Sequence, residues 1–159
     1  MNNPLVSIIV NCYNGEKYLA RTLDSILNQT YQNWEIIFWD NASQDRSSEI
    51  ANSFDNKLRF FSSQKTTVLG EARNNATKEA RGKYLAFLDC DDLWLPQKLT
   101  KQIPLFSNSK VGLVICNTYF FNEDRIKKQL YKNEHPPVRH VFRELLGKYF
   151  ISLETEVIR

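Results

Sequence analysis

Continuous apolar runs alternate with amphipathic segments along most of this chain. The first run, residues 5–12 (LVSIIVNC), is rich in β-branched side chains, which is typical of a strand buried on both faces. Residues 16–29 then carry leucine and isoleucine at helical spacing, so they predict an amphipathic helix with Asn14 as its N-cap. The same patterns predict strands at 34–39, 58–61, 83–88 and 111–116, the last extending into 117–121, and helices at 43–54, at 71–81 before Gly82 as a C-terminal cap, and from Pro96 onward.

This alternation predicts an α/β fold with a Rossmann-like, mostly parallel sheet flanked by helices. The pattern weakens after about residue 121. Residues 122–137 are polar, contain Pro136-Pro137 and predict a loop, and residues 141–146 predict a short helix. The last residues before Arg159 have the pattern of an unfinished strand.

Size and composition predict one folded domain, because the chain has 159 residues and 42% of them are hydrophobic. The net charge is only +3, and the sequence lacks a concentrated basic patch. No nucleic-acid partner is therefore expected. The N-terminus lacks the pattern of a signal peptide, and no apolar run approaches the roughly 20 residues that cross a bilayer. We therefore expect a cytoplasmic protein, with peripheral association at the inner face of a membrane as a further option.

The three cysteines, Cys12, Cys90 and Cys116, are far apart in the sequence. No pair has the spacing of metal ligands. Each lies within an apolar run, so buried free thiols in a reducing compartment are the preferred interpretation.

Polar residues follow three of the predicted strands. Residues 11–14 (NCYN), 40–43 (DNAS) and 89–92 (DCDD) each come directly after an apolar run. Ligands of parallel α/β sheets bind beyond the carboxyl ends of the strands, so these segments are expected to converge on one binding edge.

The segment 89–92 is the strongest single signal, because it places Asp89, Asp91 and Asp92 within four residues. Carboxylates this close repel each other unless something neutralises them. Mg²⁺ or Mn²⁺ does so, and such ions are commonly held by one or two carboxylates together with substrate phosphates. The alternative is a solvated acidic turn that caps the following helix.

Other candidates are less specific. Asp40 can accept a hydrogen bond from a nucleobase or ribose, or it can stabilise a turn. Tyr13 can stack on a base or pack in its loop, and Arg73 can bind a phosphate or remain an exposed helical arginine. A dinucleotide fingerprint G-x-G-x-x-G and a P-loop are both absent from the sequence.

Taken together, these stretches resemble the family-2 glycosyltransferases, which have a GT-A fold. The segments that carry the resemblance run in order through about residues 5–103. They are 6–14 (VSIIVNCYN), 23–31 (LDSILNQTY), 34–45 (WEIIFWDNASQD), 72–74 (ARN), 82–92 (GKYLAFLDCDD) and 94–99 (WLPQKL).

The resemblance implies a nucleotide-sugar site with a metal. Tyr13 would flank the nucleobase, and Asp40 or Asn41 would contact the base edge. Asp91, the last residue of the D-x-D motif, would be the main metal ligand. The full set of expected residues is Asn11, Tyr13, Asp40, Asn41, Arg73, Asp89 and Asp91 for the nucleotide sugar, and Asp91 and Asp92 for Mn²⁺ or Mg²⁺. Asp45 lies outside the cluster and is expected to matter much less.

The resemblance also implies an organisation and a reaction. Residues 1–121 would form the nucleotide-sugar-binding core, and residues 122–159 would begin an acceptor-side region that is cut short. The expected enzyme transfers a sugar, from a UDP-sugar by preference, to the hydroxyl of a glycan or lipid-linked acceptor with inversion, in polysaccharide or glycan synthesis. Nothing in the pattern marks Glu154 or Glu156 as the catalytic base, which is expected beyond residue 159.

Two other functions are alternatives to a glycosyltransferase. A truncated or non-catalytic nucleotide-binding module of the same fold is the main alternative. A phosphoryl-accepting receiver domain would need a partner lysine and a threonine or serine at other strand ends, and the sequence does not show that pattern.

Overall fold

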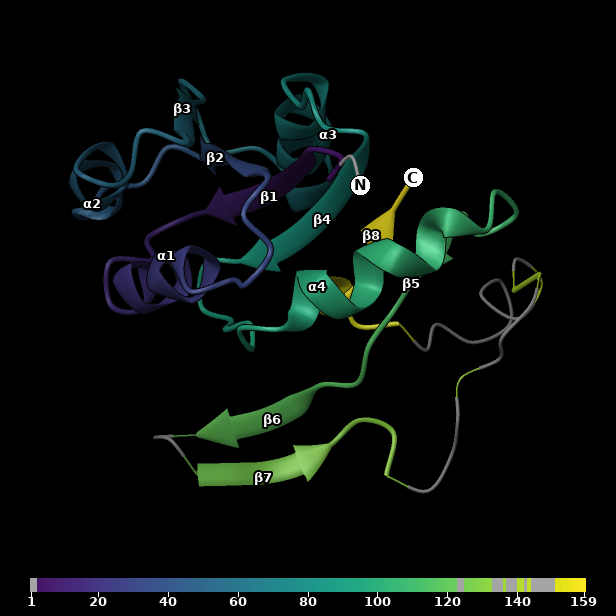
Figure 1. Cartoon of the computed structure of the whole chain (residues 1–159). Helices are drawn as coiled ribbons and strands as arrows, with labels where there is room; N and C mark the ends of the chain where they lie inside the picture. Colours follow the sequence, from purple (N-terminus) through teal and green to yellow (C-terminus); the bar gives the residue numbers. More distant parts are fainter. Residues whose placement is uncertain (1–2, 123–124, 133–135, 137–139, 142, 144–150) are drawn as a thin grey trace.

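A six-stranded sheet forms the centre of the computed structural model, which describes residues 3–122, 125–132, 136, 140–141, 143 and 151–159. The strand order is β3-β2-β1-β4-β8-β5 (Figure 1). The first four strands along the chain pair in parallel, whereas β8 runs antiparallel to both β4 and β5. The strands are β1 (Val6–Cys12), β2 (Trp34–Asp40), β3 (Leu58–Ser62), β4 (Tyr84–Asp89), β5 (Leu113–Val114) and β8 (Val157–Ile158).

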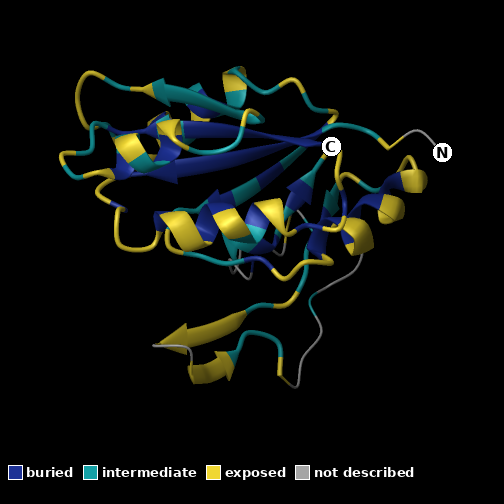
Figure 2. Cartoon of the chain, turned by 60° about the vertical axis from the view of Figure 1, so that its left-hand side comes forward, coloured by how far each residue is buried: buried dark blue, intermediate teal, exposed yellow. Residues whose placement is uncertain are grey.

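Helices cover both faces of this sheet. On one face, α1 (Leu19–Leu27) packs its buried leucines against alternate residues of β1. On the other face, α3 (Leu69–Lys78) buries Ala72 and Ala76, and Ala76 packs in a small cluster with Ile9 and Ile37. Every residue of β1 is buried, which explains its uninterrupted apolar run (Figure 2). The other helical elements are α2 (Ser47–Asn52), α4 (Lys98–Gln102), η1 (Ile103–Ser107) and η2 (Leu153–Thr155).

The α/β, mostly parallel architecture and the strands expected at 5–12, 34–39, 58–61 and 83–88 are confirmed, each within one residue of the observed bounds. The strand expected at 111–116 is much shorter, since β5 contains only two paired residues at the edge of the sheet. Among the described helices, none is long and apolar enough to cross a membrane.

A hairpin replaces the loop expected after residue 121. β6 (Tyr119–Asn122) pairs antiparallel with β7 (Arg125–Gln129) and stands apart from the main sheet (Figure 1). The prediction of a loop over 122–137 was therefore wrong for β7. Its residues are almost all exposed, so a polar composition is compatible with a strand whose pairing needs only the backbone.

Several predicted helix ends also differ from the structure. α1 begins at Leu19 after Tyr18, and the Asn14 side chain does not cap it. Asn14 instead has a positive φ of 53°, and its Oδ1 accepts a hydrogen bond from the Gln44 N–H at 2.8 Å. α3 ends at Lys78, so Gly82 is not its cap.

Gly82 is needed for close packing rather than for a helix end. A Cβ built on it would lie 2.5 Å from the Ser7 backbone nitrogen, which is closer than real Cβ atoms approach. Pro96 lies in a turn just before α4, which begins at Lys98.

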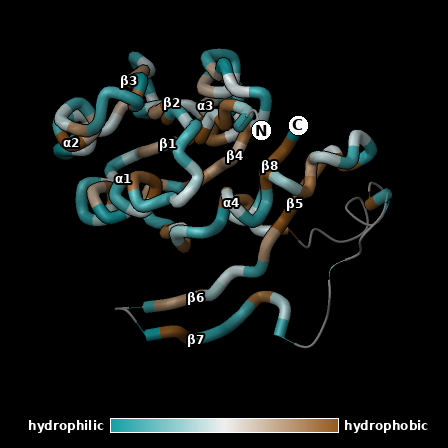
Figure 3. Tube along the Cα trace, in the orientation of Figure 1, coloured by the Kyte–Doolittle hydropathy of each residue, from teal (hydrophilic) through white to brown (hydrophobic). Residues whose placement is uncertain are grey.

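Residues 151–159 return to the sheet. β8 lies between β4 and β5, and Figure 3 shows its hydrophobic character where it enters the sheet. The Trp94 indole donates to the Glu154 carbonyl at 3.0 Å, and Gln102 Nε2 donates to the Thr155 carbonyl at 2.8 Å. In packing terms, these residues therefore belong with residues 1–121. The division at residue 121 stays a prediction in its functional sense, and the helix expected at 141–146 lies largely outside the described residues.

Candidate nucleotide and metal site

The three polar strand ends meet at one edge of the sheet. Cys12, the last residue of β1, pairs in register with Asp40 at the end of β2. On the other side of β1, Asn11 pairs with Asp89 at the end of β4. The fold thus places all three polar segments side by side beyond the carboxyl ends of parallel strands, where ligands of such sheets bind.

Asn11 contributes an unpartnered donor at this edge. Asn11 lies between Trp39 and Asp89 in the register of the sheet and is only 6% exposed. Its Nδ2 has no hydrogen-bond partner among the described residues. A buried amide without a partner is costly, and an oxygen of a bound ligand would satisfy it.

Asp40 and Asn41, in contrast, are satisfied by the protein. Asp40 is 4% exposed and accepts hydrogen bonds from the Ser43 N–H at 3.3 Å and from the Ser48 hydroxyl at 3.0 Å. Asn41 exchanges hydrogen bonds with the Thr67 backbone, donating to its carbonyl at 2.8 Å and accepting from its N–H at 3.0 Å. These contacts fit a role in stabilising the turn after β2. A contact of Asp40 or Asn41 with a nucleobase stays a prediction.

The loop that carries Tyr13 is joined to the loop after β2. Ser43, Asp45 and Ser47 accept hydrogen bonds from backbone N–H groups of residues 14–16 at 2.8–2.9 Å. Tyr13 itself is 51% exposed. Asp45 also accepts from the N–H and hydroxyl of Ser47, and these hydrogen bonds lower the pKa of its carboxyl although desolvation opposes them. Asp45 is thus a structural residue, so the expectation that it matters little does not extend to stability.

Arg73 and Asp89 form an ion pair. Arg73 Nη2, on α3, lies 2.6 Å from Asp89 Oδ1 at the end of β4. The arginine side chain is 23% exposed, so it is not the freely solvated helical arginine of the alternative interpretation. The pair brings together two residues that were singled out separately in the sequence.

The segment 89–92 forms a tight turn in which the Asp92 N–H donates to the Asp89 carbonyl at 3.0 Å. Asp91 is exposed and Asp92 is half-buried. Burial, followed by the charges of Glu154, Asp91 and Asp89 in that order, raises the pKa of Asp92 to about 7. These carboxyls do not cap α4, whose N-cap is Gln97. The alternative interpretation, a solvated acidic turn that caps the following helix, therefore does not fit Asp92.

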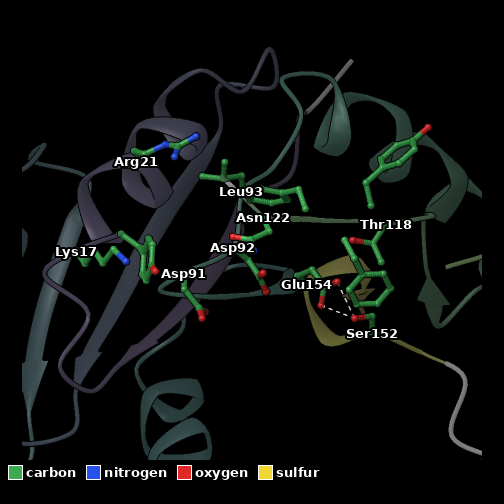
Figure 4. A pocket seen from close by; sticks show the side chains of 13 residues that line it. Lys17, Arg21, Asp91, Asp92, Leu93, Thr118, Asn122, Ser152 and Glu154 are labelled. Atoms are coloured by element: carbon green, nitrogen blue, oxygen red, sulfur yellow. Dashed lines mark hydrogen bonds between the residues drawn. The ribbon is translucent and has the colours of Figure 1, made fainter. Parts of the chain in front are cut away.

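A cavity of about 570 Å³ opens beside this turn, and Figure 4 shows Asp91, Asp92 and Glu154 along it, with Arg21 of α1 and Lys17 just before α1 to one side. Residues 118–122 of the β6 region and Ser152 complete most of the remaining wall. Of the residues predicted from sequence, only Asp91 and Asp92 line this cavity.

Glu154 is the residue that sequence reasoning missed. Its carboxylate accepts from the Ser152 hydroxyl at 2.6 and 2.7 Å, and its charge is the largest single charge effect on Asp92. No local pattern marks it, because its place in the cavity depends on β8 entering the sheet next to β4.

The residues around the acidic turn offer a partial metal site. Among the described residues, no three histidine, cysteine or acidic side chains converge into a ready-made metal cage. Two carboxylates whose charges oppose each other are nevertheless the protein share of a typical Mg²⁺ or Mn²⁺ site, where substrate phosphates supply further oxygens. The donor set fits a hard divalent ion that binds together with its ligand.

All three cysteines are free; Cys12 is buried, whereas Cys90 and Cys116 are half-buried. The Cys90 thiol donates a hydrogen bond that lowers the pKa of Cys12, while the same contact and burial raise the pKa of Cys90. Burial also lowers the pKa of Lys98 to about 8.

Comparison with known proteins gives consistent findings. The model of Glycosyl transferase family 2 matches residues 7–156. The chain is 33% identical to the Escherichia coli UDP-Glc:alpha-D-GlcNAc-diphosphoundecaprenol beta-1,3-glucosyltransferase WfgD, over 79% of this chain and 50% of WfgD. The chain spans about half the length of the curated relatives that it matches over most of its own length.

Two solved structures share the fold. TarS residues 1–349 from S. aureus are similar with a TM-score of 0.79 at 24% identity, over 97% of this chain and 46% of that chain. The mannosyltransferase PcManGT from Pyrobaculum calidifontis, solved with GDP-Man and Mn²⁺, has a TM-score of 0.68 at 25% identity, over 73% of this chain and 36% of that chain. Both are GT-A glycosyltransferases, so the GT-A fold implied by the sequence resemblance is confirmed.

Proposed function

Because this chain belongs to glycosyl transferase family 2, we propose that it forms the donor-binding part of an enzyme that transfers a sugar from a nucleoside-diphosphate sugar to an acceptor hydroxyl. The observation that carries the proposal is the acidic turn at 89–92, which lies at the carboxyl edge of the sheet beside a cavity of about 570 Å³. The nucleotide would lie along the same edge, over the ends of β1 and β2.

The nucleoside is assigned to the ends of β1, β2 and the start of α3. Tyr13 is exposed enough to cover a base face, and Asn11, at the end of the same strand, holds an unused donor. Arg73 is fixed by Asp89, so its guanidinium has a defined position near the expected diphosphate. Asp40 or Asn41 would contact the base edge, which requires them to share hydrogen-bonding capacity now used within the protein.

The metal is assigned to Asp91, with Asp92 as its close neighbour. A divalent ion there would neutralise the charge of the diphosphate leaving group. The raised pKa of Asp92 supports this assignment, because a carboxyl that tends to keep its proton at neutral pH lacks a neutralising partner. PcManGT, of the same fold, was solved with Mn²⁺ and a nucleotide sugar.

The donor is proposed to be a UDP-sugar, as in the name of WfgD, with a GDP-sugar as in PcManGT the second option. The acceptor is proposed to be a glycan or a lipid-linked sugar in polysaccharide synthesis, since the printed acceptor of WfgD is diphosphoundecaprenol-linked. Inversion at the anomeric carbon and peripheral association with the inner face of the membrane complete the proposal.

Calorimetric titration of the chain with UDP and with GDP tests the donor site directly. We expect UDP binding in Mn²⁺ and little binding in EDTA, because the acidic turn and the diphosphate repel each other without a cation. Asp91→Asn should lower the affinity in Mn²⁺ by about a hundredfold, since it removes one charged oxygen ligand.

Asp24→Asn, on the exposed face of α1, is the matched control and should bind UDP as the unaltered chain does. Equal affinity in Mn²⁺ and EDTA would reject the metal assignment. Release of the sugar from a UDP-sugar, with and without an added acceptor, distinguishes an enzyme from a module that only binds nucleotide.

A further inference from the structure

Two thiols lie close together, one at the end of β1 and one within the acidic turn at 89–92. Cys12 ends β1, and Cys90 follows β4 one position beyond the registered pair of Asn11 and Asp89. Neighbouring strands of a sheet lie about 4.8 Å apart. That separation falls within the range of Cα distances that a disulfide spans.

Gly15 shows how close the two sulfurs are. A Cβ built on Gly15 would lie 2.7 Å from Cys12 Sγ and 2.8 Å from Cys90 Sγ. Both sulfurs therefore lie next to the same Gly15 Cα. The Cys90 thiol also donates a hydrogen bond to Cys12. Both thiols are free.

We propose that Cys12 and Cys90 form a reversible disulfide that acts as an oxidative switch on the donor site. The disulfide itself follows from the geometry of the two strands, whereas its effect on ligand binding rests on the proposed function. Packing alone would require only two small apolar side chains at these positions. Their place is specific, because Cys90 stands between Asp89 and Asp91, and Gly15 belongs to the loop that carries Tyr13.

A hydroperoxide is the oxidant class that balances the reaction. The sulfur of Cys12, whose pKa is lowered by the hydrogen bond from Cys90, attacks a peroxide oxygen as thiolate, so that an S–O bond forms while the O–O bond breaks and one water leaves with the first thiol proton. The second sulfur then displaces the oxygen, forming the S–S bond as the S–O bond breaks and a second water leaves. Two thiols and one hydrogen peroxide thus give one disulfide and two waters, with half-buried Cys90 as the second sulfur.

Closing the bond would change the metal site. The sulfurs must move from non-bonded contact to about 2.05 Å, which draws the backbone of Cys90 toward β1. Asp89 and Asp91 flank Cys90 and would move with it. Metal–oxygen distances tolerate changes of only about 0.2 Å, so such a shift is sufficient to weaken the binding of a cation and of the nucleotide that shares it.

The experiment compares the reduced chain with the chain treated with hydrogen peroxide. A proteolytic map without reductant should show the peptides of Cys12 and Cys90 joined, with the mass lowered by two hydrogens. Calorimetry with UDP and Mn²⁺ should show an affinity lowered about tenfold or more in the oxidised chain, restored by dithiothreitol. Cys12→Ala should prevent both changes, and Cys90→Ala provides a second variant should the first fold poorly. Cys116→Ala is the matched control and should respond to peroxide as the unaltered chain does.

The outcomes separate the two claims. Absence of the joined peptide after oxidation would overturn the disulfide, whatever the chain binds. A joined peptide with unchanged UDP affinity would overturn the switch and leave a structural crosslink. If the reduced chain does not bind UDP with Mn²⁺, the proposed function fails, and the peptide map still decides whether the disulfide forms.

Discussion

The ends of β2 and β4 carry similar acidic residues at the same edge of the sheet, yet the protein treats them differently. At the end of β2, Asp40 is buried and its carboxylate accepts hydrogen bonds from Ser43 and Ser48. At the end of β4, Asp92 is half-buried beside other carboxyls, and its pKa is raised to about 7. The first carboxylate is stabilised within the chain, whereas the charge of the second is opposed by burial and by its neighbours.

This difference separates a carboxylate that stabilises the fold from one that we propose for a ligand. A carboxylate with internal donors holds two loops in place, and its loss is felt as lost stability. A carboxylate that opposes its neighbours costs stability in the free protein and gains its value only when a cation binds. The two kinds of residue should therefore respond in opposite ways to neutralising substitutions.

The largest expected effect on stability is at Asp40. Asp40→Ala should lower the free energy of unfolding by about 1–3 kcal/mol, because it leaves the Ser43 N–H and the Ser48 hydroxyl without their acceptor. Urea denaturation measures the change. Asp24→Ala on α1 is the matched control, expected within about 0.5 kcal/mol of the unaltered chain. An unchanged urea midpoint for Asp40→Ala would remove the contrast between the two strand ends.

A smaller effect of opposite sign is expected at Asp92 in the metal-free chain. The pKa of its carboxyl is about 7 in the folded chain against an ordinary value of 3.8, so the folded state holds a proton that the unfolded state has lost between these values. The contribution of Asp92 to stability is thus greatest below about pH 4 and is lost as the pH rises through 7. Thermal unfolding in EDTA should show a melting temperature that falls more between pH 5 and pH 8 in the unaltered chain than in Asp92→Asn. Parallel pH profiles would contradict the raised pKa.

The smallest effect is expected at the ion pair of Arg73 and Asp89. Both side chains are partly exposed, so Arg73→Met should change the free energy of unfolding by no more than about 1 kcal/mol. UDP affinity in Mn²⁺ should fall more than stability does, since we propose that Arg73 lies near the diphosphate. Measuring unfolding and UDP binding on the same preparation checks this, and a loss confined to stability would assign the pair to the fold alone.

The sequence predicted the elements whose burial is periodic. β1 and β2 were placed within one residue because both are buried almost throughout, which produces continuous apolar runs. The convergence of Asn11, Asp40 and Asp89 also followed, because parallel strands direct their carboxyl ends to one edge. These predictions depend only on local periodicity and on the geometry of parallel sheets.

The sequence did not reveal features that depend on distant contacts. The polar strand β7 has almost no buried residues, so its composition resembles that of a loop. Glu154 enters the cavity only because β8 pairs with β4, and no spacing near residue 154 signals this pairing. Asn14 was expected to cap a helix, but its side chain bonds to the loop after β2 instead. In each case the deciding contact joins segments far apart in the chain.

The position of β8 sets an order of assembly on this chain. β5 has β8 as its neighbour in the sheet, so it cannot join the sheet until residues 157–158 are available to pair. The parallel strands β1 to β4 need only residues up to 89 and can fold while later residues are still being synthesised. During that interval the outer edge of β4 has unpaired backbone groups, and such an edge can pair with another chain. Ribosome-bound intermediates that end before residue 157 should therefore be the most prone to aggregation.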